Sequence, residues 1–364
     1  MVIITLTVLF ALGLSGMAMN TSLQINKTEK INKATDLAEM GITYYKQKVD
    51  SIMVNAFSGK IITNQSELKT VMTQIKNDMN KIPTDQPKIN VSGNEISYAI
   101  KDLAVDISNP ASILVNFKTV GTSDTENREI SYKINYTINQ GKPLPVYNIT
   151  DPGTFSSSSD ECYKTNKIDY QKCFYSPRQT VPDVKIENSI IKVGGNGDLG
   201  HFNNVTSSQI YISGDILFSK VNNITNLRLH VEGDLLKGSE LLDFTNFKGN
   251  TRLEIQGNAS ISKLNNIREN FELLIGKNLT LDELSSNTNG NIIVYGDASI
   301  KALSNNSNMN VCIFGKYNGP DPKPSYVRVY GETGFESDPV CGPYATARVP
   351  FVLESDPEEN VSYK

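Results

Sequence analysis

LEIQGNASISKLNNI, residues 253–267, carries a pattern that returns about every twenty residues along the chain. Four and two residues before a shared landmark position, each repeat carries an apolar side chain, which is the alternation of a β-strand. A fixed period of this length indicates stacked supersecondary units. The repeat predicts a parallel β-solenoid over residues 188–316. In it, Ile255 should point inward between Val231 and Ile275, and Gln256 should face solvent.

The landmark is a glycine in all but one repeat, and an aspartate or asparagine follows it. The landmarks are Gly214, Gly233, Gly257, Lys277, Gly296 and Gly315, and the residues that follow the first five are Asp215, Asp234, Asn258, Asn278 and Asp297. We expect these side chains to stack at one corner, about 4.8 Å apart per coil. Two interpretations remain: a turn that needs a positive φ angle, and a calcium site built from the same oxygens. The turn needs no metal, because exposed neighbouring carboxylates repel each other by only about 1 kcal/mol in water.

Asparagine pairs recur at or beside a second turn of the repeat. Asparagine adopts a left-handed backbone conformation more readily than most residues, and asparagine side-chain amides can stack in ladders. We therefore expect a left-handed corner at Asn222-Asn223, Asn265-Asn266 and Asn305-Asn306.

Length and composition bound the function. The chain has 364 residues, 38% of them hydrophobic, and a net charge of -4 with a pI near 5.5. A nucleic-acid partner is not expected, because it would need a basic face to meet phosphate. Of the two histidines, His201 and His230, neither has a nucleophile at a suggestive spacing, so a surface or hydrogen-bonded histidine is expected. No catalytic residue, cofactor site or metal site is predicted.

Residues 1–19, MVIITLTVLFALGLSGMAM, carry no charged side chain. Their length suits a helix that crosses a bilayer. A cleavable secretory signal is the alternative, because Gly16 and Ala18 are small residues of the kind a signal peptidase recognises. In the polar stretch that follows, apolar residues recur at steps of three and four and so lie on one face of a helix. This pattern predicts one long helix, apolar at first and then amphipathic. These apolar residues are Ile31, Ala34, Ala38, Ile42, Tyr45, Val49 and Ile52.

The pattern then changes from helix to strand. Residues 65–81 carry a second helical pattern, which ends where Ile82 precedes Pro83. Alternating segments follow at 95–103, 113–120 and 128–138, separated by polar turn residues. We expect these strands to form a small antiparallel sheet packed on the long helix. Residues 20–140 would then be a helix with an α+β head.

The N-terminal region resembles a known family. The run VIITLTVLFALGLSGMAMNTSLQINKTEKINKATDLAEMGITYY is similar to the N-terminus of type IV pilin-like proteins of the minor-pilin kind, and Ala38-Glu39-Met40-Gly41 matches an element of that family. The resemblance implies an α+β head and covers about the first 55 residues. An ordinary anchor followed by an ordinary amphipathic helix is the alternative. The apolar part, residues 1–19, differs from the family in having no glutamate inside it and no charged leader ending in glycine before it.

Four cysteines lie outside the head. Residues 141–187 form an expected linker that holds Cys162 and Cys173, whereas Cys312 lies on the last coil and Cys341 in a tail over residues 317–364. In an exported chain these residues are disulfide candidates, as Cys162–Cys173 and Cys312–Cys341. The alternative is buried free thiols, because connectivity cannot be deduced from sequence. The tail is also a candidate cover for the open end of the solenoid.

We therefore expect an α+β chain: a transmembrane and amphipathic helix, a small head, and a parallel β-solenoid. The expected function is that of a membrane-anchored, single-pass prokaryotic surface protein with an extracellular domain, used for binding or assembly. Its expected partners are the membrane and other pilin-like subunits or a surface polymer. A secreted solenoid hydrolase or lyase acting on polysaccharide, and a polymer-forming scaffold, are the alternatives. Asn-x-Ser/Thr triplets mark either glycosylation or chance, and begin at Asn148, Asn204, Asn223, Asn258, Asn278 and Asn360.

Overall fold

A computed structural model of the chain describes residues 2–84, 89–91, 94–153, 167–177, 185–218, 220–237, 242–346, 348–354 and 357–363. The chain divides into two compact units. One unit contains Met1–Gly141 together with Pro350–Lys364, and the other contains Lys142–Val349. The second unit is therefore inserted into the first, because the chain leaves the first unit at Gly141 and returns to it at Pro350.

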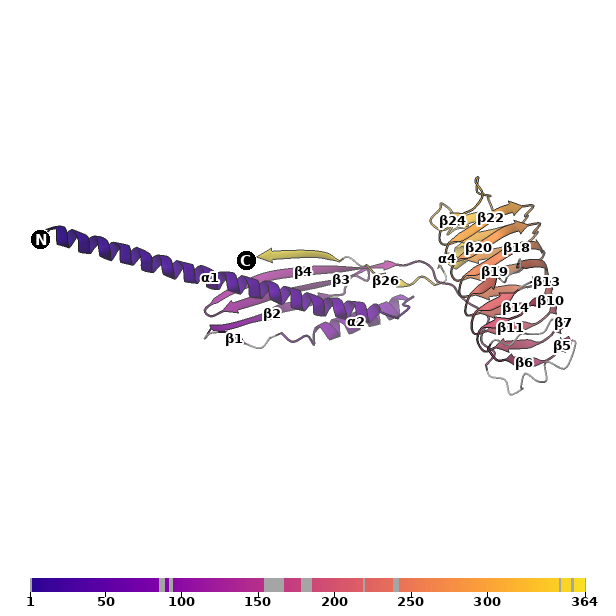
Figure 1. Ribbon diagram of the computed structural model, residues 1–364, viewed down its shortest axis with the longest axis horizontal. Helices are drawn as coiled ribbons and strands as arrows, with labels where there is room; N and C mark the ends of the chain where they lie inside the picture. The colour runs from indigo at the N-terminus through magenta and orange to yellow at the C-terminus, as the bar shows by residue number, and fades with distance from the viewer. Residues whose placement is uncertain are drawn as a thin grey trace. The chain divides into compact units, whose positions relative to one another are not determined.

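The first unit is built on one long helix, α1 (Val2–Phe57). From Ile3 to Glu29 every described side chain of α1 is exposed. Beyond that point a stripe at steps of three and four residues turns toward the sheet and is fully buried, as Ala34, Ala38, Tyr45, Val49 and Met53. The helix is thus apolar and bare in its first half and amphipathic in its second half (Figure 1). This arrangement is the one that the sequence predicts.

An antiparallel sheet packs against the second half of α1. Its strands lie in the order β1-β2-β3-β4-β26, and β27 also pairs with β4. The bounds are β1 (Ile89–Val91), β2 (Asn94–Asp106), β3 (Ser112–Ser123), β4 (Glu126–Gln140), β26 (Phe351–Leu353) and β27 (Glu358–Tyr363). A second helix, α2 (Gln65–Met79), buries Leu68, Met72, Ile75 and Met79 in the same hydrophobic core.

The helix backbone approaches β3 at one place that only glycine allows. A Cβ atom on Gly121 would lie 1.9 Å from the carbonyl oxygen of Ala34 and 2.5 Å from the nitrogen of Ala38. Beside it, the buried Thr119 hydroxyl donates a hydrogen bond to the carbonyl oxygen of Ala38, at 2.9 Å. Small residues on both elements therefore fix where α1 crosses the sheet.

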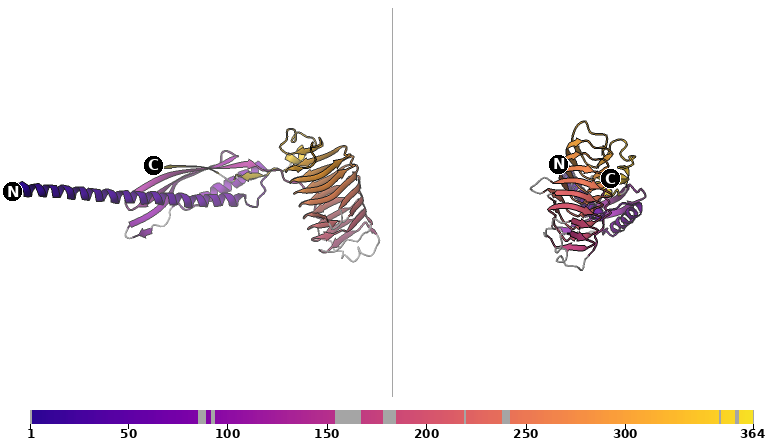
Figure 2. Two further views of the ribbon diagram at one scale, coloured as in Figure 1. Left: turned by 45° about the horizontal axis from the view of Figure 1, so that its top comes forward. Right: turned by 90° about the vertical axis from the view of Figure 1, so that its right-hand side faces the viewer.

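The second unit is a parallel β-solenoid, whose strands stack coil on coil (Figure 2). One sheet contains β6 (Lys172–Tyr175), β8 (Ile190–Val193), β11 (Gln209–Ile212), β14 (Arg228–Val231), β17 (Arg252–Ile255), β19 (Phe271–Ile275), β21 (Gly290–Val294), β23 (Met309–Ile313) and β25 (Val327–Val329). The other contains β5 (Lys167–Asp169), β7 (Lys185–Glu187), β9 (Gly197–Asp198), β10 (His201–Thr206), β12 (Ile216–Phe218), β13 (Lys220–Thr225), β15 (Leu235–Lys237), β16 (Asp243–Lys248), β18 (Ala259–Ile267), β20 (Leu279–Ser285), β22 (Ala298–Ser304) and β24 (Tyr317–Asn318). A short helix, α4 (Gly342–Thr346), follows the last coil.

The inward direction predicted from the repeat is confirmed. Ile255 pairs with Val231 on one side and with Ile275 on the other, and all three are 0% exposed. The left-handed corner is confirmed as well, since φ is 54° at Asn223, 53° at Asn266 and 51° at Asn305. The fold class is therefore the one expected: a long helix, a small antiparallel sheet and a parallel β-solenoid.

The boundaries of the solenoid differ from those expected. The solenoid already includes β5, β6 and β7, within the segment expected to be a linker, and Ile168, Cys173 and Tyr175 are buried in its core. Tyr175 pairs with Val193, which puts Pro177 at the landmark position of this coil, so the glycine pattern does not reveal it.

The C-terminal tail is also divided differently. Only its first part stays with the solenoid, because residues from Pro350 onward belong to the first unit. There β26 and β27 pair antiparallel with β4. Their position in the sheet depends on the edge of β4, which lies more than two hundred residues earlier in the chain.

Candidate functional sites

The first half of α1 has the properties of a membrane span. It is long and apolar enough to cross a membrane, and its most apolar stretch is not buried by any other part of the described chain. Large apolar side chains are exposed along it, among them Ile4 at 71%, Leu9 at 62% and Phe10 at 67%. The hydroxyl of Thr7 donates to the carbonyl oxygen of Ile3 at 2.8 Å, so this polar group is paired within the helix. Such pairing suits a segment surrounded by lipid.

The aspartates and asparagines that follow the landmarks form a continuous ladder along one corner. The Oδ1 atom of each accepts a hydrogen bond from the backbone nitrogen of the equivalent residue one coil further on. Asp234 Oδ1, for example, accepts from the nitrogen of Asn258 at 2.7 Å. The ladder runs from Asn196 through Asp215, Asp234, Asn258, Asn278 and Asp297 to the nitrogen of Lys316. One oxygen of each side chain is thus engaged in joining the coils.

The landmark glycine serves this ladder, and the expected positive φ is wrong. Positive φ angles occur at other glycines of the solenoid, such as Gly249, and not at Gly257. A Cβ atom on Gly257 would instead lie 2.0 Å from Asp234 Oδ1 and 2.6 Å from the carbonyl oxygen of Gly233. Glycine is favoured at this position because a Cβ atom would overlap the side chain and backbone stacked beneath it. The coil with Lys277 at this position has the longest bond of the ladder, 3.2 Å from Asn278 nitrogen to Asn258 Oδ1.

We predict that Gly257→Ala destabilises the solenoid by about 1 to 3 kcal/mol, because the new methyl group overlaps backbone and carboxylate atoms of the coil below. The matched control is Lys277→Ala, at the same position one coil further on, where a Cβ atom is already accommodated. Urea denaturation of both variants measures the difference. Equal effects of the two substitutions would contradict the assigned role of the glycine.

The structure offers no further support for a calcium site at this corner. Among the residues that the structure describes, no group of three or more histidine, cysteine, aspartate or glutamate side chains is placed to hold a metal ion.

The outer face of the sheet that contains β17 is covered rather than open. Its outward row should be solvent-exposed by the alternation rule, yet His230, Glu254, Leu274 and Cys312 are at most 2% exposed. Two segments far apart in the sequence provide the cover. Residues 147–149 lie over Glu254, and Phe335, Cys341 and Ala345 pack on the later coils to form a second hydrophobic cluster.

Glu254 is the polar centre of this covered face. Its carboxylate accepts hydrogen bonds from the backbone nitrogens of Asn148 at 2.7 Å and Ile149 at 3.0 Å. It also accepts from Arg252 Nε at 2.6 Å and lies 2.9 Å from His230 Nδ1. Burial alone would raise the pKa of Glu254, but the bonds from His230, from the two backbone nitrogens and from Arg252 outweigh burial and hold the pKa at about 2. The side chain is therefore an anion, and its hydrogen bonds hold residues 147–149 against the solenoid.

The ring of His230 and both of its nitrogens contact neighbouring side chains. Its ring stacks on Tyr211 with centroids 4.9 Å apart, and the ring of Tyr147 meets it edge-on at 5.4 Å. Gln256 Nε2 lies 3.0 Å from His230 Nε2. Gln256 is accordingly half-buried, and the expectation that it faces solvent is wrong. His230 is thus a buried, hydrogen-bonded histidine, which is one of the two expected possibilities. The side chain of His201 lies outside the described residues.

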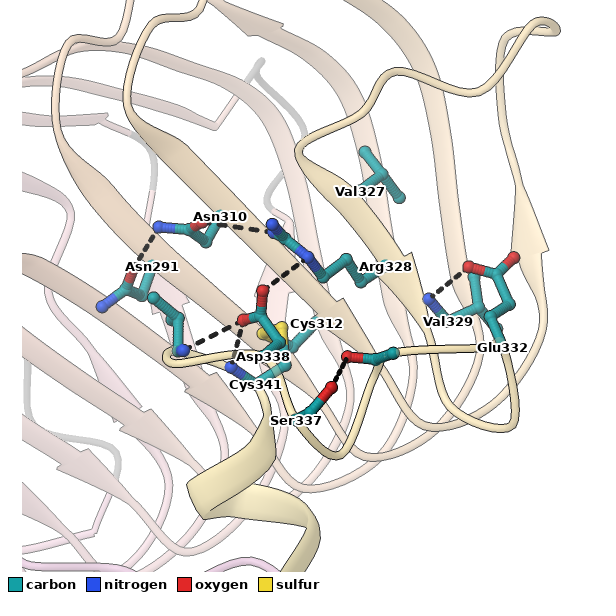
Figure 3. A network of polar contacts seen from close by, with 12 residues as sticks. Asn291, Asn310, Cys312, Val327, Arg328, Val329, Glu332, Ser337, Asp338 and Cys341 are labelled. Carbon is teal, nitrogen blue, oxygen red and sulfur yellow. Dashed lines mark hydrogen bonds and ion pairs between the residues drawn. A yellow bond between two sulfur atoms is a disulfide. The ribbon is translucent and has the colours of Figure 1, made fainter.

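The structure brings Cys312 and Cys341 together in a disulfide, with Cα atoms 5.5 Å apart. Beside it, Asp338 forms an ion pair with Arg328 Nε at 2.8 Å and accepts from the backbone nitrogen of Cys341 at 2.8 Å (Figure 3). The segment that follows the last coil is thereby fixed on the outer face. Cys173 is buried in the first coil, and Cys162 lies outside the described residues.

Fold and sites together define the class: a chain with a helix fit to span a membrane, an antiparallel α+β head, and a parallel β-solenoid inserted into that head. Comparison with protein-family models, with curated proteins and with solved structures finds no match for this chain.

Proposed function

We propose that this chain is a membrane-anchored, outward-facing prokaryotic surface protein of the type IV pilin-like kind, whose solenoid serves binding or assembly. The observation that carries the proposal is the exposed apolar half of α1. Apolar surface costs about 25 cal/mol per Å² in water. A helix pairs its own backbone groups except at its two ends, as a lipid environment demands. A bare helix of this kind is favourable in a membrane and unfavourable in water.

The pilin-like assignment is supported by how α1 continues. The apolar half runs without a break into a half that packs on an antiparallel sheet, as the family resemblance implies. Within the matching element, Ala38 is fully buried, and its carbonyl oxygen accepts the Thr119 hydroxyl. Gly41 is buried as well, and a Cβ atom there would lie 3.2 Å from the methyl carbon of Thr119. These small residues of the element are the ones at the helix–sheet contact.

The disulfide supports an outward-facing solenoid. Disulfides form and persist in oxidising compartments and are rare where thiols are kept reduced. Because the Cys312–Cys341 bridge lies in the solenoid unit, we place that unit outside the cytoplasm. The partners in this proposal are the membrane and other pilin-like subunits or a surface polymer, with the apolar helix packed among similar helices.

We predict that Leu9→Arg combined with Leu12→Arg releases the full-length protein from the membrane fraction. Each arginine at the centre of a span costs about 2.5 to 3.5 kcal/mol on an insertion scale. The matched control is Leu9→Ile combined with Leu12→Ile, which keeps the segment apolar. Carbonate-washed membranes are probed for the protein, and protease added to intact cells tests its orientation. Wild-type protein found wholly in the soluble fraction would sink the proposal.

A further inference from the structure

We propose that Asn305 is an acceptor of N-linked glycosylation, modified with an oligosaccharide from a lipid-phosphate-linked donor. The triplet Asn305-Asn306-Ser307 has the acceptor pattern Asn-x-Ser. This inference rests on the outward-facing placement proposed above, because such modification belongs to the exported surface of a protein.

The turn between β22 and β23 presents this triplet to solvent. Asn305 and Ser307 are both exposed, and Asn305 has a φ of 51°. The middle residue is held inward: Asn306 Nδ2 donates to the carbonyl oxygen of Leu284 at 2.9 Å and to the Tyr326 hydroxyl at 3.2 Å. Within the described residues, the amide of Asn305 has no hydrogen-bond partner. Within the part of the chain that the structure describes, the acceptor amide and the hydroxyl two residues later are therefore both exposed and without a side-chain hydrogen bond.

The same corner of the solenoid carries other exposed triplets. Asn305 continues a row of left-handed residues, one per coil, that runs through Asn204, Asn223, Asn246, Asn266 and Ser286. Asn204 and Asn223 begin triplets too, but their amides contact each other, with Asn223 Nδ2 donating to Asn204 Oδ1 at 3.3 Å. Among the described residues Asn305 has no such partner, so its whole amide is open to a transferase.

Asn258 shows what a blocked triplet looks like. It is half-buried in the corner ladder, where its Nδ2 atom lies 3.3 Å and 3.4 Å from the two carboxylate oxygens of Asp234. Its Oδ1 atom accepts from the backbone nitrogen of Asn278 at 3.2 Å. A transferase would have to break the ladder to reach this amide. The structure thus separates an open triplet from a closed one in the same repeat.

The chemistry is a substitution at the anomeric carbon of the donor sugar. The Nδ2 atom of Asn305 forms the new C–N bond, and the bond from that carbon to the phosphate oxygen of the lipid breaks. The lipid phosphate leaves with the bonding electron pair, and the amide loses one proton to a base of the transferase. No oxidant or reductant is required.

The test is peptide mass spectrometry of the full-length protein, purified from membranes of the organism that encodes it. We expect a saccharide mass on the peptide that contains Asn305 and none on the peptide that contains Asn258. Ser307→Thr should keep the modification, whereas Ser307→Ala and Asn305→Gln should remove it. Ser307→Ala is the sharper variant, because it leaves the acceptor asparagine in place.

The orientation of the same sample separates this inference from the proposed function. Unmodified Asn305 in protein that is membrane-bound and cut by external protease would overturn the glycosylation and leave the anchor proposal standing. Modification that survives Ser307→Ala would also overturn it, because the triplet would then not direct the transfer. Protein that is neither membrane-bound nor reached by external protease would overturn both proposals together.

Discussion

Replacing Ile255 with aspartate should abolish cooperative folding of the solenoid. The side chain is 0% exposed and stacks between Val231 and Ile275 of the adjoining coils. A carboxylate at this place would be buried without a partner, at a cost of several kcal/mol, which is comparable to the whole stability of many domains. Urea denaturation of the full-length protein in detergent, followed by protease resistance of the solenoid, measures the loss.

The matched control is Thr280→Asp. Thr280 lies on β20, where it pairs with Ser260 and Ser299, and it is exposed. The same carboxylate placed here stays in water, so the effect should remain below about 1 kcal/mol. Equal damage from Ile255→Asp and Thr280→Asp would refute the inward and outward directions on which the stacked-coil architecture depends.

Replacing Glu254 with alanine should destabilise the covered face by about 3 to 5 kcal/mol. The substitution leaves Arg252 and the backbone nitrogens of Asn148 and Ile149 without their shared acceptor, and breaking a buried ion pair on one side has costs of this size. The matched control is Glu283→Ala, which removes an ion pair to Lys263 at 3.0 Å whose side chains are 34% and 38% exposed, and which should cost at most about 1 kcal/mol. Similar losses in the two variants would show that Glu254 is not a buried anion that stabilises the covered face.

The contribution of Glu254 also has a defined pH dependence. Its pKa is lowered from 4.5 to about 2 in the folded chain, so the unfolded chain binds the proton first as pH falls. The stability that the carboxylate provides is therefore complete above about pH 5 and disappears as pH falls through the folded value. The difference in unfolding free energy between wild type and Glu254→Gln should be constant at neutral pH and shrink from about pH 4.5 toward pH 2. A free-energy difference that does not change over this pH range would contradict the conclusion that Glu254 is a buried anion that stabilises the covered face.

Much of the solenoid can be predicted from the sequence because the repeat assigns a direction to every side chain. A buried position such as Ile255 is read from alternation alone, and the Asn-Asn pairs mark the corner whose backbone is left-handed. The long helix can be predicted equally well, because its buried residues from Ala34 to Met53 recur with the helical period. Both are local periodicities, and each depends only on neighbours in the chain or on the next coil.

Other features depend on contacts between residues far apart in the chain. The outward row of β14 and β17 has the alternation of an exposed face, and nothing near His230 or Glu254 in the sequence indicates that residues 147–149 cover them. The repeat locates Gly257 but not the reason for it, which is the Asp234 side chain of the preceding coil. The coil that carries Pro177 lacks the glycine signal, so its sequence resembles that of a linker.

Local sequence patterns specify the class of each segment: an uncharged apolar helix, an alternating head, and a repeat that can only bury its apolar rows by stacking. The tertiary structure decided how the segments are connected and covered. It inserted the solenoid between β4 and β26, laid two distant segments over one solenoid face, and made Glu254 a buried anion. The physical reason is that periodicity records which side of an element is apolar, whereas the partner that covers that side is chosen by packing and hydrogen bonding across the fold.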